Sequence, residues 1–267
     1  MAQTTTFCFP VKDLSSDAVK LTPFEVSPSL LCTLLRALNL IYMLIRFQPE
    51  KHATAYFEGS KDHPELYKYM SIGPYETRDD FINGFLVDLV GKQSPGMTTF
   101  AIIDKKRPPS DADPEGQLAG MVSYMAASPV HLSAEVGYII ILPPFQRTHV
   151  TTHAVGLLLQ YALNSPEQGG LGLRRMQWLA DPPNKASLAA ARRMGFEQEG
   201  ILRWNRVMVD AGARGKGHNG REGPPYGKPS DRGRDTVYLS MCWDDWLGGK
   251  DKHVERLMLR PIVVKEP

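Results

Sequence analysis

Polar side chains crowd one short stretch of the chain, residues 144–159, just ahead of an apolar run. The stretch, PFQRTHVTTHAVGLLL, holds a glutamine, an arginine, three threonines and two histidines. At a helix start, where N–H groups lack partners and the macrodipole is positive, an arginine fork and hydroxyl groups would bind a phosphate. Two histidines four residues apart on a helix would instead bind a metal ion, and a threonine could simply cap the helix.

The metal interpretation has the weaker basis in the sequence. His149 and His153 have the spacing of H-E-x-x-H sites, but Val150 stands where the glutamate base would be, and no third ligand follows at a recognisable spacing. We expect the helix to begin near Thr151, which leaves His149 in the loop. The sequence therefore predicts no metal site, and both histidines are expected to be bystanders or pocket lining.

The elements that would position this stretch follow from hydrophobic patterns and breaker residues. Two short helices at 63–70 and 77–91, the second capped by Thr77, precede three consecutive strands at 97–106, 116–127 and 134–142. A helix at 151–163, a strand at 173–180, a helix at 184–194 and strands at 196–209 and 235–243 complete the order. This order predicts an α/β or α+β fold, with a sheet that carries helices on its faces.

Charge and cysteine content exclude several classes of protein. The 267 residues are 42% hydrophobic and carry a net charge of +2, which gives no general attraction to nucleic acid. Cys8, Cys32 and Cys242 show no C-x-x-C spacing, so neither a disulfide framework nor a thiolate zinc site is indicated. The N-terminus lacks the features of a secretory signal, and we expect a cytoplasmic protein.

One apolar segment, SLLCTLLRALNLIYMLIRF at 29–47, is long enough to span roughly 28 Å as a helix. Arg36 lies near its middle, where a charge costs about 2.5 to 3.5 kcal/mol on insertion scales. Asn39 and Arg46 add to that cost. We therefore predict a buried or groove-covering helix, and no membrane partner.

The segment WLADPPNKASLAAARRMGFEQEGILR, about thirty residues after the polar stretch, carries a recognisable combination of motifs. With AEVGY before it and GRDTVYLSMCWDDW after it, it resembles the GNAT acyltransferase superfamily, specifically fungal-type members of its RimJ/RimL-like branch. The resemblance implies a single GNAT-like domain over 1–267 with a core at about 57–246, built on a mixed, mostly antiparallel, twisted sheet. It also implies an N-acetyltransferase that takes acetyl-CoA as the acyl donor and an amine as the acceptor.

The turn that binds coenzyme A in the family usually reads Q/R-x-x-G-x-G/A. Here Gln146 is followed by His149 and Thr151 where small residues are expected, so the backbone cannot approach the pyrophosphate as closely as glycine allows. The resemblance implies a glycine-poor phosphate clamp that begins at Gln146. Its binding groups are expected to be the helix N-terminus and the side chains of Arg147, Thr148, Thr151 and Thr152.

An amine acceptor with a pKa near about 10.4 must lose a proton before it attacks, so a carboxylate should act as base. Glu135, in the fourth strand of the family order, is the first candidate, with a cross-strand ion pair as its alternative role. Asp181, just past the fifth strand, is the second. The residue four positions before the Gly-Phe pair, often a tyrosine acid in the family, is Ala191, which leaves the protonation of the thiolate unassigned.

Backbone N–H groups where the fourth and fifth strands of the family diverge are expected to stabilise the oxyanion. The candidates are Ile140, Ile141 and Leu142. In this branch Asn184 and Ser187 match residues that contact the pantetheine arm, although Asn184 could equally cap its own helix.

Two unusual segments bear on the acceptor. Residues 25–46 separate LTPF from FQPEKHA, which the family holds close together, so this segment is either an inserted helix that covers the acceptor pocket or translated intron. Residues 210–234 form a Gly-, Pro- and charge-rich stretch interpreted as a mobile hairpin insert. We expect a small-molecule amine as acceptor and a monomer or homodimer; a non-catalytic GNAT-shaped binding module and a protein N-terminal acetyltransferase are the alternatives.

Overall fold

The computed structural model describes residues 7–23, 49–91 and 95–262. The expected insertion at 25–46, and Cys32 with it, lies outside these ranges. Among the described residues, no helix combines the length and apolar character that a membrane span requires.

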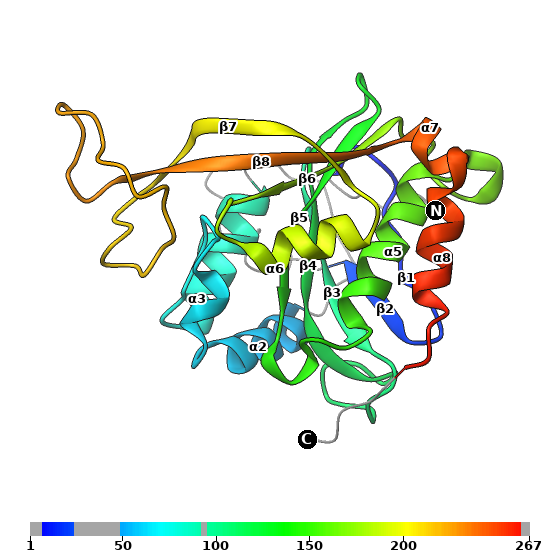
Figure 1. The fold of residues 1–267 in the computed structure, drawn as a ribbon. Coiled ribbons are helices and arrows are strands. Elements are labelled where there is room, and N and C mark those ends of the chain that lie inside the picture. Colours follow the sequence, from blue (N-terminus) through cyan, green and yellow to red (C-terminus); the bar gives the residue numbers. More distant parts are fainter. Residues whose placement is uncertain (1–6, 24–48, 92–94, 263–267) are drawn as a thin grey trace, which may run out of the picture.

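Eight strands form one sheet in the order β1-β2-β3-β4-β5-β6-β8-β7 (Figure 1). Every neighbouring pair is antiparallel except β5 and β6, which run parallel. The strands are β1 (Leu14–Ser15), β2 (Val19–Pro23), β3 (Thr98–Asp104), β4 (Gln117–Ser128), β5 (Ser133–Ile141), β6 (Arg175–Ala180), β7 (Glu197–Met208) and β8 (Arg232–Cys242). The expected mixed, mostly antiparallel sheet is confirmed.

Helices flank this sheet and carry the loops of the candidate site. Before β3 come α2 (Pro49–Ser60), the 3₁₀ turn η1 (Pro64–Tyr67) and α3 (Arg78–Phe81), which continues as the π-helix η2 (Ile82–Val90). After β5 come η3 (Pro143–Phe145), α5 (Val150–Leu163), η4 (Pro166–Gln168) and α6 (Lys185–Arg193). Thr77 caps α3 as expected, because its hydroxyl accepts from the Asp80 N–H while the Asp80 carboxylate accepts from the Thr77 N–H.

The two faces of the sheet carry different helices. Tyr124 of β4 donates its hydroxyl hydrogen to the Leu158 carbonyl of α5, and Trp178 of β6 donates to the Ser187 hydroxyl of α6. Both rings therefore lie on the face covered by α5 and α6. Because side chains alternate between the faces of a strand, Glu135 and Gln177, which pair across β5 and β6, lie on the opposite face.

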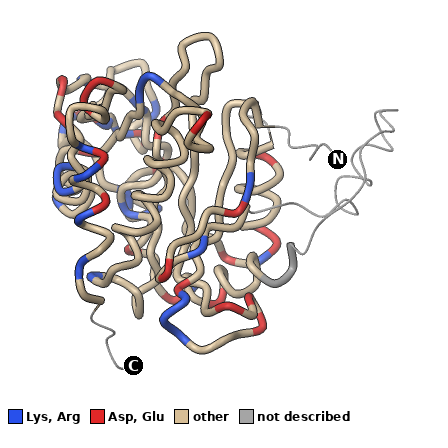
Figure 2. The backbone as a smooth tube through the Cα atoms, turned by 90° about the vertical axis from the view of Figure 1, so that its right-hand side faces the viewer, with Lys and Arg blue, Asp and Glu red and all other residues tan. Residues whose placement is uncertain are grey.

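The chain closes with helical segments that the sequence analysis did not predict. These are α7 (Trp243–Asp245), the π-helix η5 (Trp246–Lys250) and α8 (Asp251–Met258). Helix α8 packs along α5, where Gly156 allows the approach because a Cβ at that position would collide with the sulfur of Met258. Lysine and arginine residues lie interspersed with aspartate and glutamate over the described backbone, as Figure 2 shows. This distribution agrees with the small net charge.

Candidate active site

The parallel strands β5 and β6 diverge part of the way along their length. Their ladder joins Ser133 to Arg175, Ala134 to Met176 and Glu135 to Gln177, and it ends there although both strands continue. Beyond this point β5 bends at a bulge, where Tyr138 takes a φ of 45°. The divergence opens the sheet between the two strands, and Glu135 stands at its base.

Glu135 is a buried carboxyl group with an unusual environment. It is 7% exposed, and burial raises the pKa of its carboxyl to about 7, against the opposing charges of Arg206 and Arg234. It forms no ion pair with any described residue, so the cross-strand ion pair considered as its alternative role is absent from the structure. A carboxyl group that titrates near neutrality suits a general base.

Asp181 follows β6 on the same face of the sheet as Glu135. It is 1% exposed, and neither of its carboxylate oxygens has a hydrogen-bond partner among the described residues. Burial raises the pKa of its carboxyl, and the nearby charge of Arg234 opposes this shift. Arg234 in β8 is itself 7% exposed, and its Nε is buried without a partner in the described chain.

The part of the insert between β7 and β8 around Lys216 packs over this face, whereas the side chains at 222–230 are largely exposed. The insert is shorter than expected, because β8 begins at Arg232 and β7 ends at Met208. Lys216 is buried and donates to the carbonyl groups of Tyr67, at 2.9 Å, and Ile72, at 2.6 Å. Figure 1 shows this loop beside the segments around α3. This part of the insert is therefore packed against the segment that holds Tyr67 and Ile72.

The glycine-poor turn leads from η3 into α5. Arg147 has a φ of 59°, and its exposed side chain makes no hydrogen bond or ion pair within the described residues. Thr148 has a local role, because its hydroxyl donates to the Phe145 carbonyl at 2.6 Å and accepts from the Val150 N–H at 3.3 Å. Thr151 and Thr152 lie half-buried in the first turn of α5. The turn therefore combines one available cation with the start of a helix.

The two histidines of the turn have protein partners. His149 Nε2 lies 3.0 Å from the Asp104 carboxylate, and His153 Nδ1 lies 2.9 Å from the Ser16 hydroxyl. Burial, followed by the charge of His149, lowers the pKa of His153 to about 4. The rings meet edge to face with their centroids 5.7 Å apart. This arrangement uses the histidines for packing between α5, β3 and the β1–β2 turn.

Three backbone groups were expected to bind the oxyanion, and the structure separates them. The Leu142 N–H donates to the Ala119 carbonyl of β4 at 2.8 Å, so it is unavailable, contrary to expectation. Because N–H groups alternate sides along a strand, the Ile140 N–H also faces β4. The Ile141 N–H faces the other way, on the side where its own carbonyl accepts from the Gln146 amide at 3.0 Å. Ile141 is the remaining candidate.

Asn184 and Ser187 hold the start of α6 together. The Asn184 Oδ1 accepts from the Ser187 N–H at 3.1 Å, which is the cap that the sequence left as an alternative. The Ser187 hydroxyl accepts from the Trp178 Nε1 at 2.9 Å. Both side chains therefore stabilise α6, and the Nδ2 of Asn184 keeps its donors available for a ligand.

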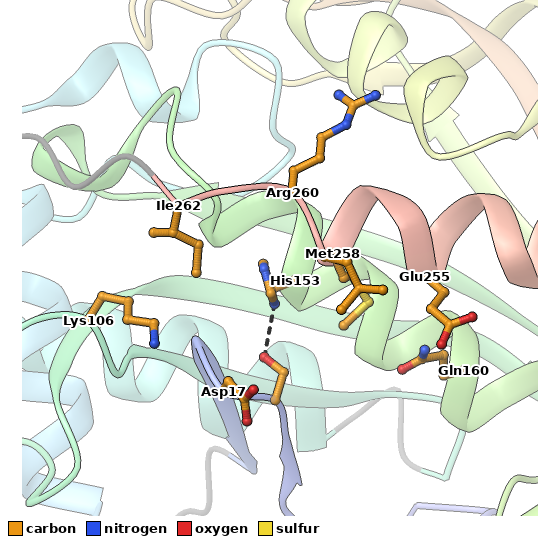
Figure 3. A pocket seen from close by; sticks show the side chains of 10 residues that line it. Asp17, Lys106, His153, Gln160, Glu255, Met258, Arg260 and Ile262 are labelled. Carbon is orange, nitrogen blue, oxygen red and sulfur yellow. Dashed lines mark hydrogen bonds between the residues drawn. The ribbon is translucent and has the colours of Figure 1, made fainter.

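A cavity of about 610 Å³ lies away from these groups, between α5, α8 and the β1–β2 turn (Figure 3). His153 points into it and bonds to Ser16 at its wall. None of the residues expected to bind coenzyme or to catalyse lines it. Its lining residues are Ser16, Asp17, Lys106, His153, Gln160, Glu255, Met258, Leu259, Arg260 and Ile262.

Arg234 and Lys216 were not predicted from the sequence as parts of the candidate site. Both lie in or beside the basic, glycine-rich insert, where a local pattern does not distinguish a buried cation from a solvated one. The alternation of β8 was the one available signal for Arg234, since it places Arg234 and Thr236 on the face opposite Val237.

Residues 43–197 match the family model described as the acetyltransferase (GNAT) domain. The uncharacterized N-acetyltransferase YoaA of Bacillus subtilis is 31% identical over 87 residues, a match that covers 33% of this chain and only 46% of YoaA.

Solved structures extend the likeness over most of the chain. A probable acetyltransferase of the GNAT family from Chromobacterium violaceum is 28% identical, with a TM-score of 0.62 over 89% of each chain. Spermidine N-acetyltransferase from Vibrio cholerae, solved with CoA and spermine, is 18% identical and shares the fold, with a TM-score of 0.50 over 76% of this chain and 96% of that one. The family model covers more than half of this chain, and the chain therefore belongs to the acetyltransferase (GNAT) domain family.

Proposed function

We propose that this protein is an acyl-CoA-dependent N-acetyltransferase that moves an acetyl group from acetyl-CoA to an amine of a small molecule. The observation that carries the proposal is the divergence of β5 and β6 directly beyond Glu135 and Gln177. It brings a buried carboxyl group, an available backbone N–H at Ile141 and the start of α5 to one opening in the sheet.

In this proposal Glu135 is the general base. Its carboxylate takes a proton from the acceptor's ammonium, directly or through water, and the amine then attacks the thioester carbonyl carbon. The new C–N bond forms first and gives a tetrahedral intermediate. The C–S bond breaks as this intermediate collapses, the nitrogen releases its second proton, and the departing thiolate of coenzyme A takes up one proton. The Ile141 N–H donates to the oxyanion of the tetrahedral intermediate, where a fixed donor stabilises developing charge.

The coenzyme side of the proposal begins at Gln146, which holds the Ile141 carbonyl. Arg147 and the first N–H groups of α5 bind the pyrophosphate, with the hydroxyl groups of Thr151 and Thr152 beside them. Thr148 acts indirectly, because its hydroxyl is engaged in shaping the turn. The donors of Asn184 and the Ser187 hydroxyl would contact the pantetheine arm.

A small acceptor is favoured because the insert packs against the Tyr67–Gly73 segment and narrows access from that side. Arg214 donates to the Gly73 carbonyl at 2.8 Å, and the Gly217 N–H donates to the Lys68 carbonyl at 2.7 Å. Membership of the fungal-type RimJ/RimL-like branch, a cytoplasmic location and a monomeric or homodimeric state complete the proposal.

Calorimetric titration with acetyl-CoA tests the donor side, and release of the coenzyme thiol in the presence of an amine panel tests transfer. We expect micromolar binding and acceptor-dependent thiol release. Binding without transfer to any small amine or peptide N-terminus would favour a non-catalytic module. The absence of binding would overturn the proposal.

A further inference from the structure

Three polar side chains on the face of the sheet that carries Glu135 are buried without partners in the described part of the chain. They are both carboxylate oxygens of Asp181, the Nε of Arg234 and the hydroxyl of Thr236. Ala180 pairs with Val237, so Asp181, the next residue after Ala180, lies beside Thr236. Arg234 lies two residues before Thr236 in β8. Alternation places all three on one face. They form a single cluster, which we call the acceptor cluster.

Opposite charges in this cluster influence one another without forming an ion pair. The charge of Arg234 acts on the carboxyl groups of both Asp181 and Glu135, so both lie within electrostatic reach of the guanidinium. Arg206, opposite Arg234 in the β7–β8 ladder, adds a second positive charge close to Glu135. No nitrogen of Arg234 comes within the 4.0 Å of an ion pair with either carboxylate, as far as the described residues show.

Leaving such groups buried and unpaired is costly. A buried donor or acceptor without a partner costs about 1 to 3 kcal/mol, and a charged one costs more. A ligand that brings both a cation and an anion would satisfy the carboxylates and the guanidinium together. A polycation would satisfy only the carboxylates and would meet the charges of Arg206 and Arg234, which repel it.

The cluster is enclosed, which limits the size of its ligand. Gly217 of the insert passes so close that a Cβ there would lie 2.8 Å from the Tyr69 ring and 3.3 Å from the Asp181 Oδ2. Lys216 fixes the insert in this position through its bonds to the carbonyl groups of Tyr67 and Ile72. The enclosed side of the cluster therefore suits a compact acceptor.

From this arrangement we infer that the acceptor is a small zwitterion of the amino-acid type, whose amine lies at Glu135 and whose carboxylate binds Arg234. Asp181 accepts a hydrogen bond from a further donor of the same molecule. This inference rests on the proposed acetyl transfer, and it names the class of acceptor. Charge-assisted bonds from a guanidinium to a carboxylate are among the stronger and more directional contacts in proteins.

The test compares matched acceptors on the full chain by release of the coenzyme thiol. Each amino acid is assayed beside its amide and beside the amine that lacks the carboxylate, with spermine as the polycation. We expect kcat/KM to be about 10- to 100-fold higher for the carboxylate-bearing member of each set, as expected for a charged hydrogen bond. Transfer to amides, simple amines or spermine at equal or higher kcat/KM would overturn the inference and leave the proposed transfer standing.

A variant pair assigns the effect to Arg234. Arg234→Gln should raise KM for the amino acid by about 10- to 100-fold, and the rise in KM for its amide should be about 10-fold smaller. Arg203→Gln, at an exposed arginine of β7, is the matched control and should change neither. Should Arg234→Gln fold poorly by thermal unfolding, Arg234→Lys keeps the charge and should show a smaller rise in KM.

An equal loss for acid and amide would contradict the assignment. Absence of transfer to every acceptor would overturn the proposed function, and this inference with it.

Discussion

The coenzyme side and the acceptor side of the candidate site differ in what their polar groups already do. On the coenzyme side, Thr148, Asn184 and Ser187 all bond to their own backbone or to a neighbouring ring, and Arg147 alone extends into solvent. On the acceptor side, Asp181 is buried with no partner in the described residues.

This difference indicates two ways to build a binding surface. On the coenzyme side, the polar side chains mainly stabilise the local backbone conformation. The affinity for acetyl-CoA should therefore depend on a few groups at the start of α5. The acceptor side keeps buried polar groups available, so removal of one group there should affect chemistry more than folding.

Replacement of Glu135 should have the largest effect on the acceptor side. Glu135→Gln removes the base and keeps the shape, so kcat/KM for acetyl transfer should fall by about 10²- to 10⁴-fold. The affinity for acetyl-CoA, measured by calorimetry, should stay within about 3-fold. Glu222→Gln, at an exposed glutamate of the insert, is the control. A loss of less than 10-fold would move the role of base to Asp181, which Asp181→Asn then tests.

The raised pKa of the Glu135 carboxyl should also make the free energy of unfolding depend on pH. Because burial raises the pKa of Glu135 to about 7, the folded protein holds a proton that the unfolded chain releases near its ordinary value of 4.5. Stability should therefore fall as pH rises from about 4.5 to about 7, by a few kcal/mol at most. In parallel, the transfer rate should rise with pH through about 7, as the base ionises.

The glutamine variant provides the matched measurement for this effect. The free energy of unfolding of Glu135→Gln should not show the fall with pH that Glu135 causes. The stability of the variant relative to the native protein should therefore increase from pH 5 to pH 8. Thermal unfolding across this range measures the difference. Parallel stability curves for the two proteins would show that Glu135 does not titrate in this window.

On the coenzyme side, Arg147→Ala should weaken acetyl-CoA binding by about 10-fold, since one charge-assisted contact to phosphate is lost. The difference should shrink at high salt, because exposed charges are screened. Arg260→Ala, at an exposed arginine beside the distant cavity, is the control. An unchanged affinity would mean that the N–H groups of α5 bind the pyrophosphate without this side chain.

Local patterns sufficed for the elements that carry the site. The β-rich runs around Ala101, Val122 and Val136, separated by Pro, Asp and Gly clusters, predicted three strands. Thr77 and Asn184 marked the starts of helices because capping depends on near neighbours. The polar start of α5 was likewise predicted within one residue. These features depend on contacts only a few residues apart.

Features that depend on distant partners were not predictable. Lys216 is buried because it meets carbonyl groups about 150 residues earlier in the chain, and nothing in its basic surroundings indicates them. The Leu142 N–H was expected to bind the oxyanion, but it donates to the Ala119 carbonyl. That partner depends on the register between β4 and β5, which the sequence does not reveal. Helix α8 follows two glycines, which argue against a helix until its contact with Gly156 of α5 is known.

Asn184 tests whether a residue on the coenzyme side both holds the shape and binds the ligand. Its Oδ1 caps α6, while its Nδ2 is available to donate to pantetheine. Asn184→Ala should cost about 1 kcal/mol of stability, whereas Asn184→Ser keeps a cap and should cost only a few tenths. If Nδ2 contacts the coenzyme, both variants should weaken acetyl-CoA binding by a similar factor of about 5. If the serine variant instead binds acetyl-CoA as the native protein does, Asn184 is a cap alone, and the coenzyme side depends more fully on the start of α5.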